Sequence, residues 1–129
     1  MAEDEGGAKP IADTGAERRW ELALWLAVRQ TPPRELSHGA KLCWDVIARW
    51  EWNGMECWAG LLRMGHELGV TEGQASRYLD QLIRRGYVHK TIGSKGKPIY
   101  QRLTSPDLHA RAEKVYQETW ARAQKDGNG

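Results

Sequence analysis

The chain has 129 residues and contains no phenylalanine, only two cysteines and no long run of apolar residues. Its longest mainly apolar stretch, residues 22–28, is too short to span a bilayer, so a membrane protein is not expected. Seven tryptophans and four tyrosines supply the aromatic side chains, so the aromatic core must carry polar groups. A chain of this length can bury the core of one ordinary domain without a metal ion or a disulfide.

The two cysteines, Cys43 and Cys57, fit a reducing compartment in which both remain thiols, and a single disulfide between them is the alternative. They form no close pair such as C-x-x-C, and His66 adds none, so no metal site is expected. The acidic start of the chain, residues 1–5, is unlike the basic start of a secretory signal. These features favour a cytoplasmic protein.

Charge is distributed unevenly, although the net charge is only +2. Residues 1–17 hold five acidic side chains and one basic side chain, a net charge of −4. Residues 71–102 hold seven basic and two acidic side chains, a net charge of +5. A concentrated basic segment is typical of a nucleic-acid-binding surface, whereas charge alone fits a solvated face equally well.

Hydrophobic periodicity and capping residues predict a mainly α fold with a small β-hairpin, an α+β class. The expected helices cover residues 16–30, 38–52, 59–68, 72–85 and 105–124, and the expected strands cover residues 87–92 and 99–103. Residues 56–58 suit only a brief strand. The expected organisation is a disordered acidic tail (residues 1–15), a central domain (residues 16–104), and a C-terminal helix with a frayed end (residues 105–129).

Apolar side chains at helical spacing predict which face of each helix is buried. The first helix is apolar most of the way round, so it is expected to be covered on two sides, one of which a partner subunit could supply. Four tryptophans, Trp44, Trp50, Trp52 and Trp58, are expected in the core rather than in a base-stacking platform. Two inward stripes are expected: Leu42, Val46, Ile47 and Trp50, and Ala75, Leu79, Leu82 and Ile83. The short helix between them is mostly apolar through Leu61, Leu62, Met64 and Leu68, and the last helix carries a stripe along one side, Leu108, Ala112, Val115, Thr119 and Ala123.

Four segments stand out in order along the chain: Leu68-Gly69-Val70-Thr71, residues 75–82, Arg85-Gly86-Tyr87-Val88 and Leu103-Thr104. Together they resemble the winged helix-turn-helix DNA-binding domain. Their pattern is similar to that of the multiple-antibiotic-resistance regulator (MarR) group, in which the recognition helix ends in a glycine before the wing. Residues 36–42, together with the same motif, also resemble winged-helix modules of phage and plasmid replication initiators. The MarR-type resemblance implies a winged helix flanked by N- and C-terminal helices, with a homodimer formed through those helices.

Ten polar or basic residues are the candidate DNA contacts: Thr71, Gln74, Ser76, Arg77, Gln81, Arg84, Lys90, Lys95, Lys97 and Arg102. A helix fits the major groove, where Gln74 can pair with adenine and Arg77 with guanine or a phosphate. Thr71 starts this helix, where free backbone amides favour an anion. The lysines and Arg102 lie on the hairpin, where they can reach phosphates.

Each of these candidates has a structural alternative. Gln74 can be an ordinary surface residue, and Arg77 can brace its own helix through Asp80. Arg84 and its neighbour Arg85 can complement the helix dipole, and the two lysines at the hairpin tip can simply keep the hairpin soluble.

The predicted function is sequence-specific binding of double-stranded DNA by a cytoplasmic transcriptional regulator that is nucleoid-associated when bound. The alternatives are a replication-initiation or partition protein of a phage or plasmid, and a winged helix that binds other proteins. No nucleophile–base pair, phosphate-binding glycine loop or pair of carboxylates stands out in the sequence. Neither enzyme activity nor a cofactor is therefore expected.

Overall fold

The computed structural model describes residues 15–121. Its elements, in chain order, are α1 (Gly15–Gln30), α2 (His38–Trp52), α3 (Leu61–Leu68), α4 (Glu72–Arg84), β1 (Val88–Ile92), β2 (Pro98–Arg102), α5 (Pro106–Tyr116) and the π-helical turn η2 (Gln117–Ala121). The acidic tail expected over residues 1–15 lies outside this range except for Gly15, as does the end of the chain from residue 122. The expected α+β class, mainly helical with one small hairpin, is confirmed.

The hairpin is a two-stranded antiparallel sheet in which Val88 pairs with Arg102 and Ile92 with Pro98. The brief strand expected at residues 56–58 is reduced to a single bridge between Cys57 and Tyr100. Within residues 15–121, no helix combines the length and the apolar character that crossing a membrane would require.

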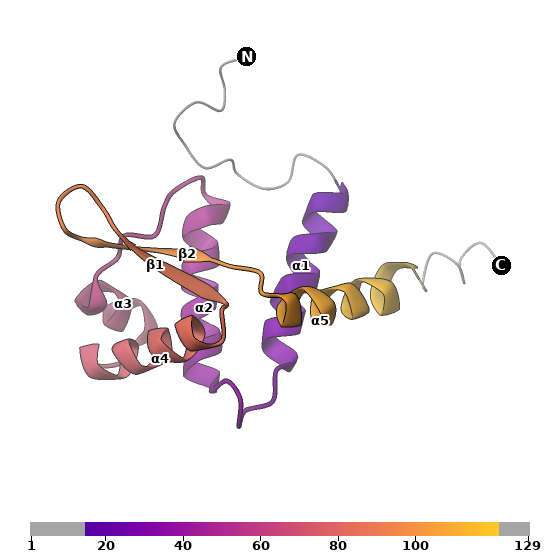
Figure 1. The fold of residues 1–129 in the computed structure, drawn as a ribbon, viewed down its shortest axis with the longest axis horizontal. Helices are drawn as coiled ribbons and strands as arrows, with labels where there is room; N and C mark the ends of the chain where they lie inside the picture. Colours follow the sequence, from indigo (N-terminus) through magenta and orange to yellow (C-terminus); the bar gives the residue numbers. More distant parts are fainter. Residues whose placement is uncertain (1–14, 122–129) are drawn as a thin grey trace, which may run out of the picture.

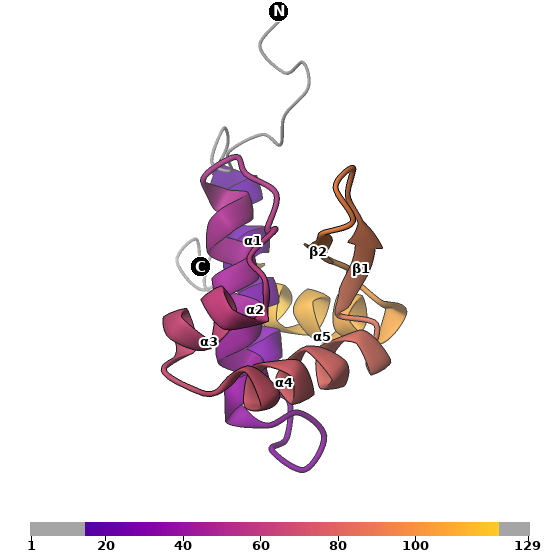
Figure 2. The ribbon, with the colours of Figure 1, turned by 90° about the vertical axis from the view of Figure 1, so that its left-hand side faces the viewer.

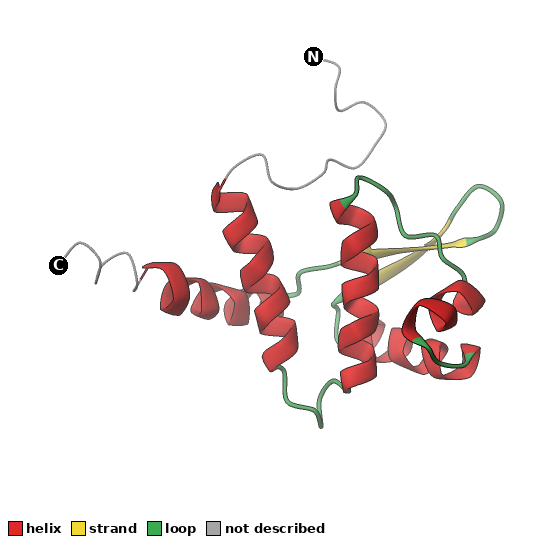
Figure 3. Cartoon of the chain, turned by 180° about the vertical axis from the view of Figure 1, so that it is seen from behind, coloured by secondary structure: helices red, strands yellow, loops and turns green. Residues whose placement is uncertain are grey.

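Helix α2 lies at the centre of the molecule, because it contacts α1, α3, α4 and β2. Helices α1 and α2 lie side by side and run antiparallel, because a short loop joins them at the same end (Figure 3). Helix α5 packs against α1, and in Figure 1 it extends to the right, in the direction opposite to the hairpin tip. The core therefore forms around α2, where Cys43, Trp44 and Ile47 are almost fully buried.

The two sides on which α1 was expected to be covered are supplied within the chain by α2 and α5. The buried residues of α5, Leu108, Ala112 and Val115, belong to its expected stripe. Thr119 of that stripe is exposed, because the helix has changed to a π-helical turn before it, and Ala123 lies outside the described residues.

Two other residues expected to point inward are exposed, Leu42 (45%) and Ile83 (36%), and Leu62 of the mostly apolar α3 is 60% exposed. Leu42 and Ile83 each lie beside a buried residue, Cys43 and Leu82 respectively. A helix turns about 100° per residue, so the positions of its neighbours decide which of two adjacent apolar side chains is covered. The sequence stripe alone does not contain that information.

Candidate nucleic-acid interface

A short turn joins α3 to α4, and its conformation follows from three residues. Gly69 ends α3 with φ = 73°, a left-handed conformation that glycine adopts without strain. Thr71 then caps α4: its hydroxyl accepts a hydrogen bond from the Gln74 backbone N–H, and the Gln74 side-chain oxygen accepts one from the Thr71 backbone N–H. The turn thereby fixes the direction in which α4 leaves α3.

Helix α4 buries one face and exposes the other. Ala75, Leu79 and Leu82 are buried on the side that meets α2 and α3. The opposite side carries most of the candidate contacts: Gln74, Arg77 and Arg84 are exposed, and Ser76 and Gln81 are half-buried.

The amino end of α4 and the tip of the hairpin reach the same side of the molecule. Both project toward the left of Figure 1, and in Figure 2 the amino end of α4 lies low and the hairpin tip high on the side toward the viewer, with α3 beside α4. The hairpin tip is a tight turn in which Gly93 donates its N–H to the Lys97 carbonyl at 2.7 Å and Gly96 has φ = 74°. Lys95 and Lys97, both exposed, lie at this tip.

Five exposed cations come from these two elements: Arg77, Arg84, Lys90, Lys95 and Lys97. None of their side chains makes a hydrogen bond or an ion pair with another residue of the range 15–121. In particular, the Arg77–Asp80 brace considered as an alternative does not form among the described contacts. We call these five residues the helix–hairpin cations.

Arg102 does not belong to this set, which corrects the sequence expectation. Its side chain is only 12% exposed, and its guanidinium lies 2.7 Å from Glu21 of α1 and 2.8 Å from Glu51 of α2. Burial opposes the charged form, but hydrogen bonds and the charges of both glutamates outweigh it and raise the pKa of Arg102. Arg102 therefore ties β2 to two helices and is not available to phosphates.

Three polar candidates on α4 are also partly engaged within the protein. The Gln81 side-chain oxygen accepts the Ser37 backbone N–H at 3.0 Å, which anchors α4 to the start of α2. Thr71 and Gln74 use one side-chain oxygen each in the capping box. Gln81 is half-buried and held by Ser37, so its side chain is poorly placed to contact a base. Thr71 and Gln74 remain exposed.

Comparison with family models, with curated proteins and with solved structures gave no match for this chain. The candidate interface therefore rests on the chain's own residues and their arrangement. That arrangement is an exposed polar helix face beside a lysine-tipped hairpin.

A second ion cluster lies at the carboxyl end of α4. Arg85 pairs with Glu35 and with Asp107, both at 3.1 Å, and the Tyr87 hydroxyl donates to Asp107 at 2.9 Å. Partial burial by itself would raise the pKa of Asp107, but hydrogen bonds from Tyr87 and Arg111 and the nearby guanidinium charges lower it. Arg85 is thus a structural residue that joins the end of α4 to α5, and Arg84 is left as the exposed cation.

Both cysteines are buried free thiols, so the alternative of a disulfide is not realised. Burial raises the pKa of Cys43 to about 12 and that of Cys57 to about 11. Among residues 15–121, no group of three or more His, Cys, Asp or Glu side chains is arranged to hold a metal ion.

The tryptophans divide between the core and the surface. Trp44 is 1% exposed, and Trp50 and Trp52 are partly buried against the core, as expected. Trp58 is 49% exposed, so its expected place in the core is wrong. The reason is that the strand containing it is only one bridge long, which leaves Trp58 beyond the last paired residue, Cys57.

Proposed function

We propose that this protein binds double-stranded DNA through α4 and the hairpin. The observation that carries the proposal is the set of five helix–hairpin cations, whose side chains have no partner among the described residues. They come from α4 and the hairpin, and the amino end of α4 and the hairpin tip reach the same side of the molecule. Unpaired cations gathered on one surface release counterions when they meet phosphates, which is the main source of affinity for DNA. Ion pairs within the protein would have removed that source.

In the proposed complex, α4 enters the major groove and the hairpin tip contacts the adjacent backbone. Gln74, Ser76 and Arg77 lie in the first two turns of α4, where side chains reach base edges, and Thr71 lies at its start. Gln74 must leave the capping box if its side chain is to pair with adenine, whereas Arg77 has no such contact to give up.

The cellular role that we propose is regulation of transcription in the cytoplasm by a homodimer that uses α1 and α5. Support for the dimer comes from α1, on which Leu22 is 44% exposed and Trp25 and Leu26 are only half-buried after α2 and α5 have packed. A two-fold dimer would read an inverted repeat with half-sites about one helical turn apart.

The decisive experiment measures affinity for a mixed-sequence duplex as a function of salt. Five phosphate contacts give a log–log slope of about −4.5, and removing one cation reduces the slope by about 1. Arg77→Ala and Lys97→Ala should both show that reduction. Arg49→Ala is the matched control, because Arg49 is an exposed cation near the end of α2, outside α4, the hairpin and the two helices of the proposed dimer. Binding that does not depend on salt, or equal effects of all three substitutions, would contradict the proposal.

Selection of bound duplexes from a random library then tests specificity and the dimer together. An inverted repeat supports the regulator, and tandem direct repeats would indicate a replication role instead. A monomer at micromolar concentration, measured by light scattering in the presence and absence of the selected duplex, would remove the dimer from the proposal.

A further inference from the structure

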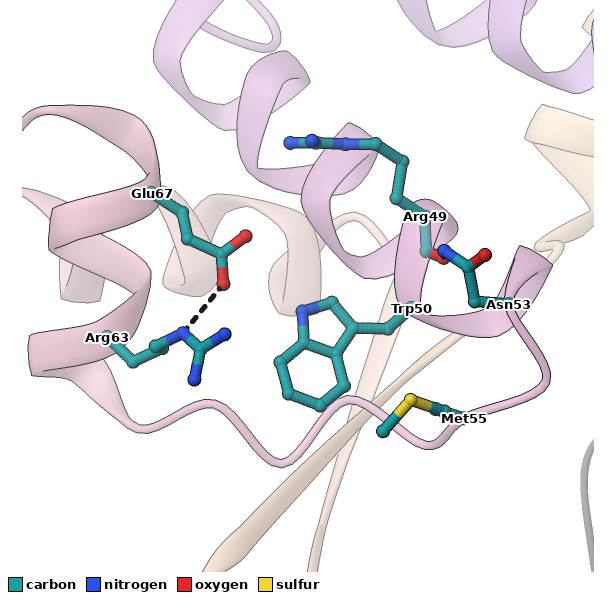
Figure 4. A pocket seen from close by; sticks show the side chains of 6 residues that line it. All are labelled: Arg49, Trp50, Asn53, Met55, Arg63 and Glu67. Atoms are coloured by element: carbon teal, nitrogen blue, oxygen red, sulfur yellow. Dashed lines mark hydrogen bonds and ion pairs between the residues drawn. The ribbon is translucent and has the colours of Figure 1, made fainter.

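A pocket of about 280 Å³ lies where α2 ends and α3 begins (Figure 4), and no residue of α4 or of the hairpin lines it. Six residues line it: Arg49, Trp50, Asn53, Met55, Arg63 and Glu67. The first three come from the end of α2 and its cap, Met55 from the connection, and the last two from α3. None of them takes part in the proposed contact with DNA.

The floor of this pocket is apolar. The indole of Trp50 lies between the Arg49 and Arg63 side chains, with the Met55 thioether at its edge (Figure 4). Met55 is 46% exposed, and Trp50 is only half-buried. Such a surface favours an occupant with an apolar side chain, because covering it removes apolar area from water.

The polar groups at the rim are mainly donors. The Arg63 guanidinium stacks 5.6 Å from the centre of the Trp50 ring and is neutralised by Glu67, 3.2 Å from its Nε. Arg49 has no ion pair, and the Trp50 indole N–H has no acceptor, among the described residues. Two hydrogen-bond donors, one of them charged, thus border the apolar floor, and a carboxylate is the group that matches them.

The apolar surface continues beyond the pocket. The Trp58 ring, 49% exposed, meets the Trp50 ring edge-on at a centroid distance of 5.4 Å. Tryptophan, methionine and arginine are the residue types enriched at protein interfaces, where they provide most of the binding energy. A small molecule held in the pocket would leave Trp58 uncovered, whereas a peptide can cover both.

We propose that this pocket is a docking site for an acidic peptide segment of another protein. One large apolar side chain of the segment lies on Trp50 and Met55, and a neighbouring carboxylate binds Arg49 and the Trp50 indole N–H. Glu56, exposed just before Trp58, would repel a second carboxylate there, so the acidic residue belongs on the Arg49 side. This interaction is separate from the proposed binding of DNA and does not depend on it.

The test is a selection from a displayed library of random 12-residue peptides on the full chain. We expect enriched peptides that place Asp or Glu beside a large apolar residue, and their binding should shift the Trp50 indole resonance in the nitrogen–proton spectrum. Arg49→Ala should weaken the best synthetic peptide about 10-fold, since it removes a charged hydrogen bond. Arg34→Ala is the control, because Arg34 is an exposed arginine before α2, at the opposite end of that helix.

The proposal is overturned if the selection enriches no peptide, if the enriched peptides lack acidic residues, or if Arg49→Ala binds them as tightly as the unsubstituted chain does. A second copy of the chain as the occupant would appear as a dimer that Arg49→Ala dissociates, and this too overturns the proposal. Duplex affinity measured on the same variants separates the two sites: Arg49→Ala should retain it, whereas Arg77→Ala should weaken it and leave peptide binding unchanged.

Discussion

Gly65→Ala tests whether the close approach of α3 to the following turn sets the geometry of the candidate interface. A Cβ atom at residue 65 would lie 2.7 Å from the Val70 carbonyl oxygen and 3.4 Å from the Thr71 carbonyl carbon. These are backbone atoms of the turn that starts α4, and the Val70 N–H also donates to the Gly65 carbonyl at 2.8 Å. An added methyl group therefore forces α3 and the turn apart.

The expected effect is the difference of two contributions. Alanine is better than glycine inside a helix by about 1 kcal/mol, and overpacking against backbone costs about 2–3 kcal/mol. We therefore expect Gly65→Ala to lower the free energy of unfolding by about 1–2 kcal/mol, which lowers the Tm of a domain of this size by roughly 5–10 °C.

Urea unfolding followed by circular dichroism measures this change, and Gly73→Ala provides the matched control. Gly73 is also helical, but its added Cβ would have Thr71 Oγ1 as its nearest neighbour, at 3.9 Å. Gly73→Ala is thus expected to stabilise the protein by up to about 1 kcal/mol. If Gly65→Ala were as stable as Gly73→Ala, the close approach would not constrain the turn, and the reasoning from it would be refuted.

Three further predictions concern buried or paired groups. Arg102→Met leaves two partly buried glutamates without their cation and should lower the free energy of unfolding, measured with urea, by about 3 kcal/mol. Adding Glu21→Gln should recover part of that loss, and no recovery would mean that the ion pairs are not its cause. Burial raises the pKa of Cys43 to about 12 and that of Cys57 to about 11, so both thiols should resist a thiol reagent at pH 8 until the chain is denatured. Rapid labelling of the native protein would contradict their burial. The pKa of Asp107 lies below its ordinary value of 3.8, so the stability that its charged form adds is present above that pH and is lost as the pH falls through the folded-state pKa. The difference in free energy of unfolding between the unsubstituted chain and Asp107→Asn should therefore shrink toward pH 2. A difference that stays constant with pH would refute the assignment.

Local signals predicted the order of the helices and strands and most of their ends, whereas the last helix, expected to reach residue 124, changes to a π-helical turn after Tyr116. Ser37, Thr71 and Ser105 each precede a helix, and in the structure the side chain of each accepts a backbone N–H of the first turn. Gly69 and Gly86 adopt the left-handed conformation at the ends of α3 and α4. Caps and turns depend on a few consecutive residues, so they can be read from the chain directly.

The partners of charged side chains were not predictable in the same way. Arg102 and Lys90 both lie on the hairpin and look alike in the sequence, but Arg102 meets Glu21, which is 81 residues away, and Lys90 meets no charged residue of the described range. Gln81 likewise finds the Ser37 backbone only because α4 crosses the start of α2. Contacts between distant segments depend on how the helices pack, which no local pattern records.

The sequence by itself determined the order of the helices, the turns and the hairpin and the capped starts of α2, α4 and α5, because those features depend on neighbouring residues. Only the tertiary structure decided which of the seven basic side chains of residues 71–102 stay exposed and without a partner and which are held inside ion pairs. It also decided that Trp58 and Met55 are left at the surface beside Trp50. The physical reason is that burial and charge pairing are set by the packing of α1, α2 and α5 around the hairpin and α4, which brings together residues far apart in the chain.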